Sequence, residues 1–137
     1  MIVSTLRRLL RRGRRRPLGP AGERSAATYL RRRGYRVLAR NVRSRVGELD
    51  LVCLAPDRRT IVFVEVKSRR LDPNRPHPPP HASVTGAKRR KLVTLAKLES
   101  RRRGWNARPK RIDVVAVEFP SGRGKPRIQH FKDAVRG

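Results

Sequence analysis

Ten acidic residues stand out in a chain of 137 residues that also carries 37 lysines and arginines. Two of the acids, Asp50 and Glu65, interrupt apolar stretches, where burying a carboxylate is costly unless its charge is compensated. Lys67 follows Glu65 by two residues, so in a strand both side chains point to one face. Two carboxylates beside an amine are the groups needed to hydrolyse a phosphodiester with the help of a divalent cation.

Each of these groups can be given a role in that chemistry. Asp50 and Glu65 are the first-choice ligands for Mg²⁺ or Mn²⁺, with the backbone carbonyl of Val66 as a third. Lys67 would position the attacking water or help to deprotonate it. Glu23 lies on the core-facing stripe of a predicted helix, so it would bind the metal directly or through water.

A network of buried ion pairs is the alternative interpretation of the same acids. Glu65 with Lys67, Glu48 with an arginine, and Asp113 with Arg111 could each neutralise locally, and such pairs perturb pKa values without catalysing anything. Otherwise Glu48 would be a further metal ligand, because it lies two residues before Asp50 and shares a strand face with it. Asp113 is expected to pair with Arg111 or to anchor the sheet.

The hydrophobic pattern predicts the elements that must position these groups. Helical spacing of apolar residues, Thr85 as an N-cap and glycines after both helices define the helices, and alternating β-branched runs define the strands. The predicted fold class is α/β, a mixed sheet flanked by helices in the order α-β-β-β-α-β-β. The expected elements are a helix at 18–33, an antiparallel meander of strands at 35–42, 48–54 and 60–67, a proline-rich loop at 71–81, a helix at 86–103, a parallel-type strand at 111–119 and a short edge strand at 127–131.

The formal net charge of +27 predicts a polyanionic partner, of which nucleic acid is the commonest. Three basic residues near the acids, Arg69, Lys88 and Lys91, are expected to contact phosphate. Residues 1–17, with seven arginines, are predicted to be a basic flexible arm, and residues 18–137 a single domain. Binding of the arm to ribosomes or a membrane surface ranks lower.

The compartment can be inferred from cysteine usage and hydropathy. The single cysteine, Cys53, excludes an internal disulfide framework and lies among apolar residues, so it is expected to fill the core. No apolar run approaches transmembrane length. A cytoplasmic protein is therefore expected.

At the acidic residues described above and in the stretches around them, the chain resembles a known family. It is similar to the YraN-like family of uncharacterised bacterial proteins, often described as endonucleases, and through it to the restriction-endonuclease-like PD-(D/E)xK superfamily and archaeal Holliday-junction resolvases. The resemblance covers residues 18–135. It is carried by residues 22–23, 41, 47–52, 62–69, 84–88, 111–117 and 128–134.

The resemblance implies a role for each matching residue. Asp50 matches the first acid of the motif, Glu65 and Lys67 its E-x-K half, and Glu23 the helix carboxylate of the resolvase branch. The implied activity is a metal-dependent endonuclease that acts on DNA rather than RNA, on branched or structured substrates, leaving 5′-phosphate ends. Resolvase-like enzymes are often dimers, so a homodimer is a further expectation. The alternative is a catalytically inactive nucleic-acid-binding module of the same fold.

Overall fold

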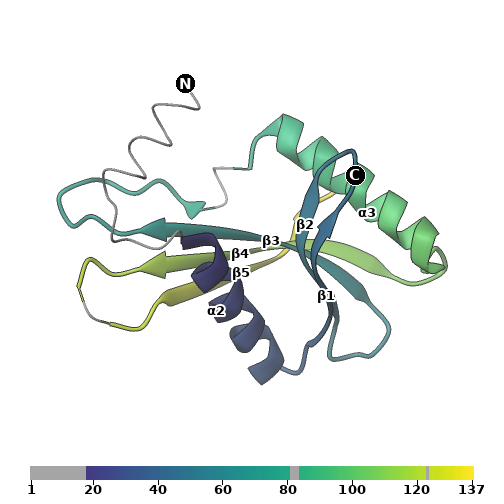
Figure 1. Cartoon of the computed structure of the whole chain (residues 1–137), viewed down its shortest axis with the longest axis horizontal. Helices are drawn as coiled ribbons and strands as arrows, with labels where there is room; N and C mark the ends of the chain where they lie inside the picture. Colours follow the sequence, from purple (N-terminus) through teal and green to yellow (C-terminus); the bar gives the residue numbers. More distant parts are fainter. Residues whose placement is uncertain (1–17, 81–83, 123) are drawn as a thin grey trace.

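The computed structural model describes residues 18–80, 84–122 and 124–137, so the expected arm at residues 1–17 lies outside the described residues. The described elements form one five-stranded sheet with two helices, which confirms the predicted α/β class and element order (Figure 1). In chain order they are α2 (Leu18–Arg32), β1 (Arg36–Arg43), β2 (Glu48–Leu54), β3 (Ile61–Arg70), α3 (Gly86–Arg103), β4 (Lys110–Phe119) and β5 (Arg127–Val135).

The five strands follow chain order across the sheet. β1, β2 and β3 pair antiparallel, which confirms the predicted meander, and β4 and β5 are antiparallel as well. β3 and β4 are parallel, because α3 lies between them in the chain and returns it to the same end of the sheet. The two helices lie on opposite faces of the sheet (Figure 1).

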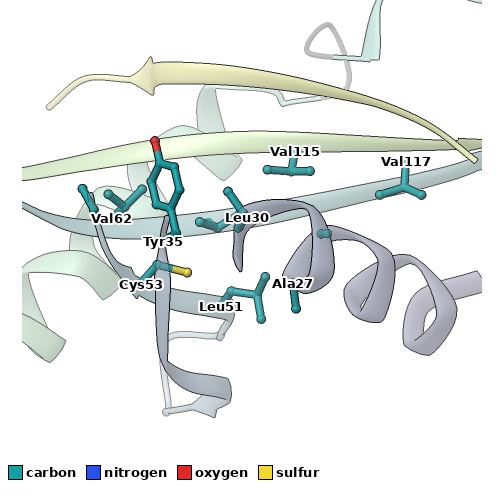
Figure 2. Close-up of a cluster of buried hydrophobic side chains, with 11 residues drawn as sticks. Ala27, Leu30, Tyr35, Leu51, Cys53, Val62, Val115 and Val117 are labelled. Atoms are coloured by element: carbon teal, nitrogen blue, oxygen red, sulfur yellow. The ribbon is translucent and has the colours of Figure 1, made fainter. Parts of the chain in front are cut away.

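The α2 face is covered by a core in which the helix supplies small residues. Ala26, Ala27 and Leu30 of α2 are at most 1% exposed and pack over alternate residues of the central strands (Figure 2). Cys53 lies in this cluster with no exposure, which confirms its expected role as core filler. The other buried strand residues of this cluster are Leu51, Val62, Val64, Val115 and Val117.

The α3 face is covered by the other set of alternate strand residues. Phe63 is fully buried there, and Leu92, Leu95 and Ala96 of α3 pack in the same cluster. The side chain of Thr85 accepts a hydrogen bond from the N–H of Lys88, so the predicted N-cap is confirmed. Because both faces of β3 and β4 are buried, side chains of these strands are fixed in direction.

Two strands are longer than the hydrophobic pattern predicts. β3 continues to Arg70, because its parallel pairing with β4 extends through the polar residues after Val66. β5 runs to Val135 rather than ending at residue 131, and its pairing with β4 is irregular near Ile112. Asp133 has φ 52 at this irregularity, a conformation that Asp tolerates better than most residues. The predicted length of this strand was therefore wrong, whereas its predicted place at the edge of the sheet is confirmed.

Candidate active site

Asp50 reaches β3 where β2 and β3 separate. Ladder pairing between the two strands covers Leu51 to Leu54 only. One residue before that ladder, Oδ2 of Asp50 accepts a hydrogen bond from the backbone N–H of Val66 at 2.8 Å. The Asp50 carboxylate thus replaces a ladder bond and lies against β3, next to Glu65.

The carboxyl groups of Asp50 and Glu65 are close enough to hydrogen-bond. Burial and then the charge of Glu65 raise the pKa of Asp50 to about 7, although the Val66 N–H opposes this by stabilising the charged form. Glu23 adds a smaller repulsive contribution. The structure therefore brings together the two acids that the sequence predicted as metal ligands.

Lys67 completes the predicted E-x-K arrangement. Its Nζ lies 3.1 Å from Glu65 Oε1, and the two side chains are only 22% and 18% exposed. Burial alone would lower the pKa of Lys67, but the charge of Glu65, hydrogen bonding with Glu65 and the charge of Asp50 act together with the other contacts of the amine to raise the pKa above its ordinary value. Lys67 is therefore cationic at neutral pH, which favours positioning over proton abstraction among its two predicted roles.

Glu23 and Glu48 are connected through a residue that the motif analysis did not assign. The side-chain amide of Asn41 faces two acceptors, so its nitrogen donates to Glu23 Oε2 and Glu48 Oε1, both at 3.1 Å. Asn41 has φ 48, which Asn adopts more readily than most residues. Its signal in the sequence was a polar residue poorly suited to strands at position 41 of an alternating run.

Gly22 allows α2 to approach β3 closely enough to bring Glu23 to this cluster. A Cβ at residue 22 would lie 1.7 Å from Ser68 Oγ and 2.9 Å from Ser68 Cβ. Any side chain there would push the helix and the strand apart. Gly22 therefore sets the distance between Glu23 and the strand that carries Glu65.

The predicted phosphate contacts differ in their surroundings. Lys88, in the first turn of α3, has its amine beside that of Lys67, and this close contact and the Lys67 charge lower the pKa of Lys88. Lys91, one turn later, packs over Gly47, the residue before β2. Arg69 instead pairs with Glu118 and donates to a carbonyl of the proline-rich loop.

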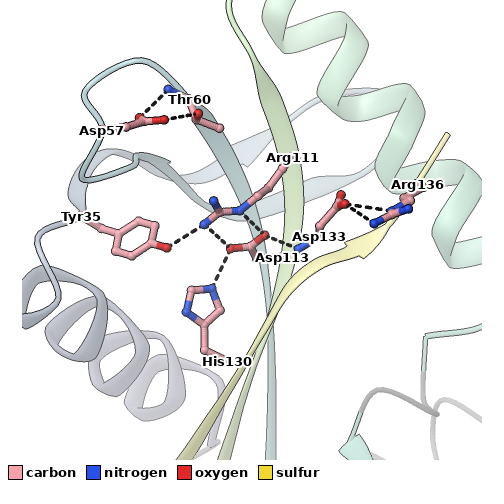
Figure 3. Close-up of polar contacts among 8 residues, drawn as sticks. All are labelled: Tyr35, Asp57, Thr60, Arg111, Asp113, His130, Asp133 and Arg136. Carbon is pink, nitrogen blue, oxygen red and sulfur yellow. Dashed lines mark hydrogen bonds and ion pairs between the residues drawn. The ribbon is translucent and has the colours of Figure 1, made fainter.

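Asp113 lies in a separate polar cluster with Arg111 and His130 (Figure 3). It is fully buried and accepts hydrogen bonds from Arg111 Nε at 2.9 Å and the Asp133 N–H at 2.9 Å, as predicted for a residue that pairs with Arg111. His130 Nε2 contacts its other oxygen at 2.6 Å. These bonds outweigh the effect of burial and hold the pKa of Asp113 below its usual value.

The donor set suits a cation that takes few protein ligands. Across the described ranges, no three His, Cys, Asp or Glu side chains converge as a metal-binding group. Asp50 and Glu65 do converge, and their mutual repulsion is the kind that a divalent cation relieves. Mg²⁺ commonly binds through one or two carboxylates while it keeps waters and substrate phosphate. The residues present therefore fit Mg²⁺.

Comparison with known proteins places the chain in one family. The model of the uncharacterised protein family UPF0102 matches residues 22–117, which include the site described above. UPF0102 protein STH1475 of Symbiobacterium thermophilum is 48% identical over 82% of this chain and 92% of its own length. UPF0102 protein RSal33209_1090 of Renibacterium salmoninarum is 43% identical over 84% of this chain and 92% of its own.

A UPF0102 protein of Pelobacter propionicus is 40% identical over 85% of this chain and 80% of its own length. Among the described residues, no helix is both long and apolar enough to cross a bilayer. The family match covers most of the stretch that suggested the YraN-like resemblance. The chain belongs to the uncharacterised protein family UPF0102, the YraN family.

Proposed function

We propose that this protein is a metal-dependent endonuclease that hydrolyses phosphodiester bonds in DNA. One observation carries the proposal: Asp50 and Glu65 face each other across the gap between β2 and β3, with Lys67 3.1 Å from Glu65. Groups with strongly perturbed pKa values that lie together are frequent at catalytic sites. The net charge of +27 supports a phosphate-backbone substrate.

Each residue of the site would contribute a separate effect. Asp50 and Glu65 would hold Mg²⁺ or Mn²⁺, which when bound neutralises phosphate charge and makes water a better nucleophile. The ammonium of Lys67 would orient the attacking water and stabilise charge that develops on the phosphate. Lys88 would bind the neighbouring phosphate, because its amine lies beside Lys67 at the start of α3.

Glu23 and Glu48 would support the cation site formed by Asp50 and Glu65. Glu23 and Glu48 share the Asn41 amide, and the charge of Glu23 acts on Asp50. They would bind the cation through water. Branched or structured DNA is the substrate class we favour, and a homodimer would place two such sites on one substrate.

A second candidate is a binding module of the same fold without catalysis. The observation that favours it is the direct Glu65–Lys67 ion pair, because a site whose charges are already paired needs no cation for stability. Such a module would bind nucleic acid through its arginines with an affinity that falls steeply with salt.

Cleavage assays separate the two candidates. Purified protein is incubated with linear duplex and four-way-junction DNA in Mg²⁺, Mn²⁺ or EDTA, beside Glu65→Gln, Lys67→Met and the control Asp133→Asn. Asp133 belongs to the separate Asp113 cluster, and its side chain pairs with Arg136, so its variant should cleave as the natural chain does.

The nuclease proposal predicts metal-dependent cleavage by the natural chain. In both site variants the cleavage rate should fall by at least about a hundredfold while DNA binding persists. Binding without cleavage in every metal, equal in all variants, would falsify the enzyme and leave the module. Cleavage that survives in Glu65→Gln would place the active centre elsewhere.

A further inference from the structure

A small pocket adjoins the candidate active site on the same face of the sheet. Its volume is about 350 Å³, and it is lined by residues 67–69 of β3, residues 78–80 of the proline-rich loop, and Ala116 and Glu118 of β4. Lys67 forms part of the pocket wall and also contacts Glu65 through its Nζ atom. A group bound in the pocket would therefore lie directly beside a phosphate held at Lys67.

Arg69 holds residues 78–80 of the proline-rich loop, which form one wall of the pocket, against the sheet. Its guanidinium donates to Glu118 Oε2 through Nε at 2.8 Å and through Nη2 at 2.5 Å. A third donor, Nη1, binds the carbonyl oxygen of Pro78. The Arg69 and Glu118 side chains are only 28% and 7% exposed, so water competes little for these charge-assisted bonds. The pocket is thus preformed rather than assembled around a ligand.

The chemistry of the walls suits a flat ring with polar edges. Three consecutive prolines at residues 78–80 have no N–H donors and a fixed φ, so they present a rigid, mostly apolar surface. The guanidinium of Arg69 is planar and stacks well on aromatic rings. Ala116, the parallel partner of Lys67, is buried and contributes its methyl group to the pocket lining on β4. Cavities of a few hundred Å³ with this lining are typical of small-molecule sites.

We propose that this pocket binds the nucleobase of an unpaired nucleotide next to the scissile phosphate. The inference rests on the proposed nuclease function and narrows its substrate class. A base that is paired and stacked within a duplex cannot enter a pocket, so it must be flipped out or come from a single strand. Single strands, bulges and junction points should therefore be cut in preference to continuous duplex.

Base occupancy can be measured without cleavage. Oligonucleotides with one 2-aminopurine, a base whose fluorescence changes when its stacking changes, are titrated with protein in EDTA, with the probe moved one position at a time. Pro79→Ala removes part of the wall, and Ala116→Leu places a larger side chain in the pocket lining on β4. Pro73→Ala is the matched control, because Pro73 is exposed in the same loop and does not line the pocket.

We expect a fluorescence change at one probe position with the natural chain and with Pro73→Ala. Pro79→Ala and Ala116→Leu should lose that change while they retain salt-dependent binding measured by anisotropy. In Mg²⁺, a substrate with an unpaired base should be cut at least about tenfold faster than duplex, since flipping a paired base costs a few kcal/mol.

These measurements distinguish failure of the base-pocket proposal from failure of the nuclease proposal. Equal signals at all probe positions, or an unchanged signal in both pocket variants, overturn the base pocket even if cleavage is observed. Cleavage of duplex as fast as of unpaired substrate overturns it as well. Failure of the natural chain to bind the oligonucleotides overturns both proposals. A position-specific fluorescence change without cleavage in any metal supports base binding and contradicts the nuclease proposal.

Discussion

Replacing Asp50 by Asn should make this protein more stable and, if it is a nuclease, inactive. The Asn side chain keeps an oxygen that can accept the Val66 N–H, and its amide can donate to Glu65. It removes the negative charge that burial and Glu65 disfavour. The variant therefore relieves an electrostatic cost without opening a cavity, because the two side chains have nearly the same shape.

The size of the effect follows from the Asp50 pKa, which rises from 3.8 to about 7. One pKa unit is worth about 1.4 kcal/mol, so the charged form costs the folded chain at most about 4 kcal/mol. Asp50 is half-buried, and residual solvent screening reduces this figure, so we expect a gain of about 2 kcal/mol. A raised carboxyl pKa means that the folded chain binds more protons than the unfolded one. Stability is therefore lost as pH rises from about 4 to about 7.

Urea unfolding of both proteins across this pH range tests the argument. Near pH 4 the natural Asp50 is protonated when folded, so the free energies of unfolding should nearly coincide; near pH 8 Asp50→Asn should be the more stable. Asp133→Asn is the control, since Asp133 is half-exposed and has a φ that Asn also tolerates. An Asp50→Asn variant less stable than the natural chain near pH 8, or a gain independent of pH, would refute the reasoning.

Three further outcomes follow from the same geometry. Mg²⁺ must displace the proton held near Asp50, so its affinity measured by calorimetry should rise with pH up to about 7 and level off above it. Gly22→Ala should lower the free energy of unfolding by about 1–3 kcal/mol through overlap with Ser68, and Ser68→Ala should restore part of the loss in chemical denaturation. Asp113→Asn should lower the free energy of unfolding by about 3 kcal/mol at neutral pH, because it leaves the Arg111 charge poorly paired. Because the pKa of Asp113 is lowered in the folded chain, this stabilisation is present above about pH 4 and is lost as pH falls through the lowered value. The free energies of unfolding of the two proteins should therefore converge in acid.

The fold could be predicted from the sequence wherever one face of an element is buried. Helix Gly86–Arg103 and strand Glu48–Leu54 match their predicted bounds, because a capping threonine, a terminal glycine and an apolar run each have a local cause. β5 could not be predicted in full, since its second half depends on the Asp133 N–H reaching Asp113, twenty residues away in the chain. Local patterns contain no information on such a bond.

The site shows the same division between local and distant causes. The spacing of Glu65 and Lys67 fixed their common face, and the position of Asp50 one residue outside the ladder brought it to β3. The role of Asn41 depends on α2 and β2 meeting at β1, which no spacing along the chain reveals. The pairing of Arg69 with Glu118 likewise depends on the register of two parallel strands.

The separation of β2 from β3 links stability to function in this chain. If the ladder continued past Leu51, the Val66 N–H would bond to backbone and Asp50 would lose the donor that draws it toward Glu65. The strands instead part at the site and leave a carboxyl pair whose charge the fold alone does not balance. Natural proteins tolerate such local costs mainly where function requires them. The unfavourable Asp50–Glu65 contact is for this reason stronger support for a cation site than the favourable Glu65–Lys67 pair is against it.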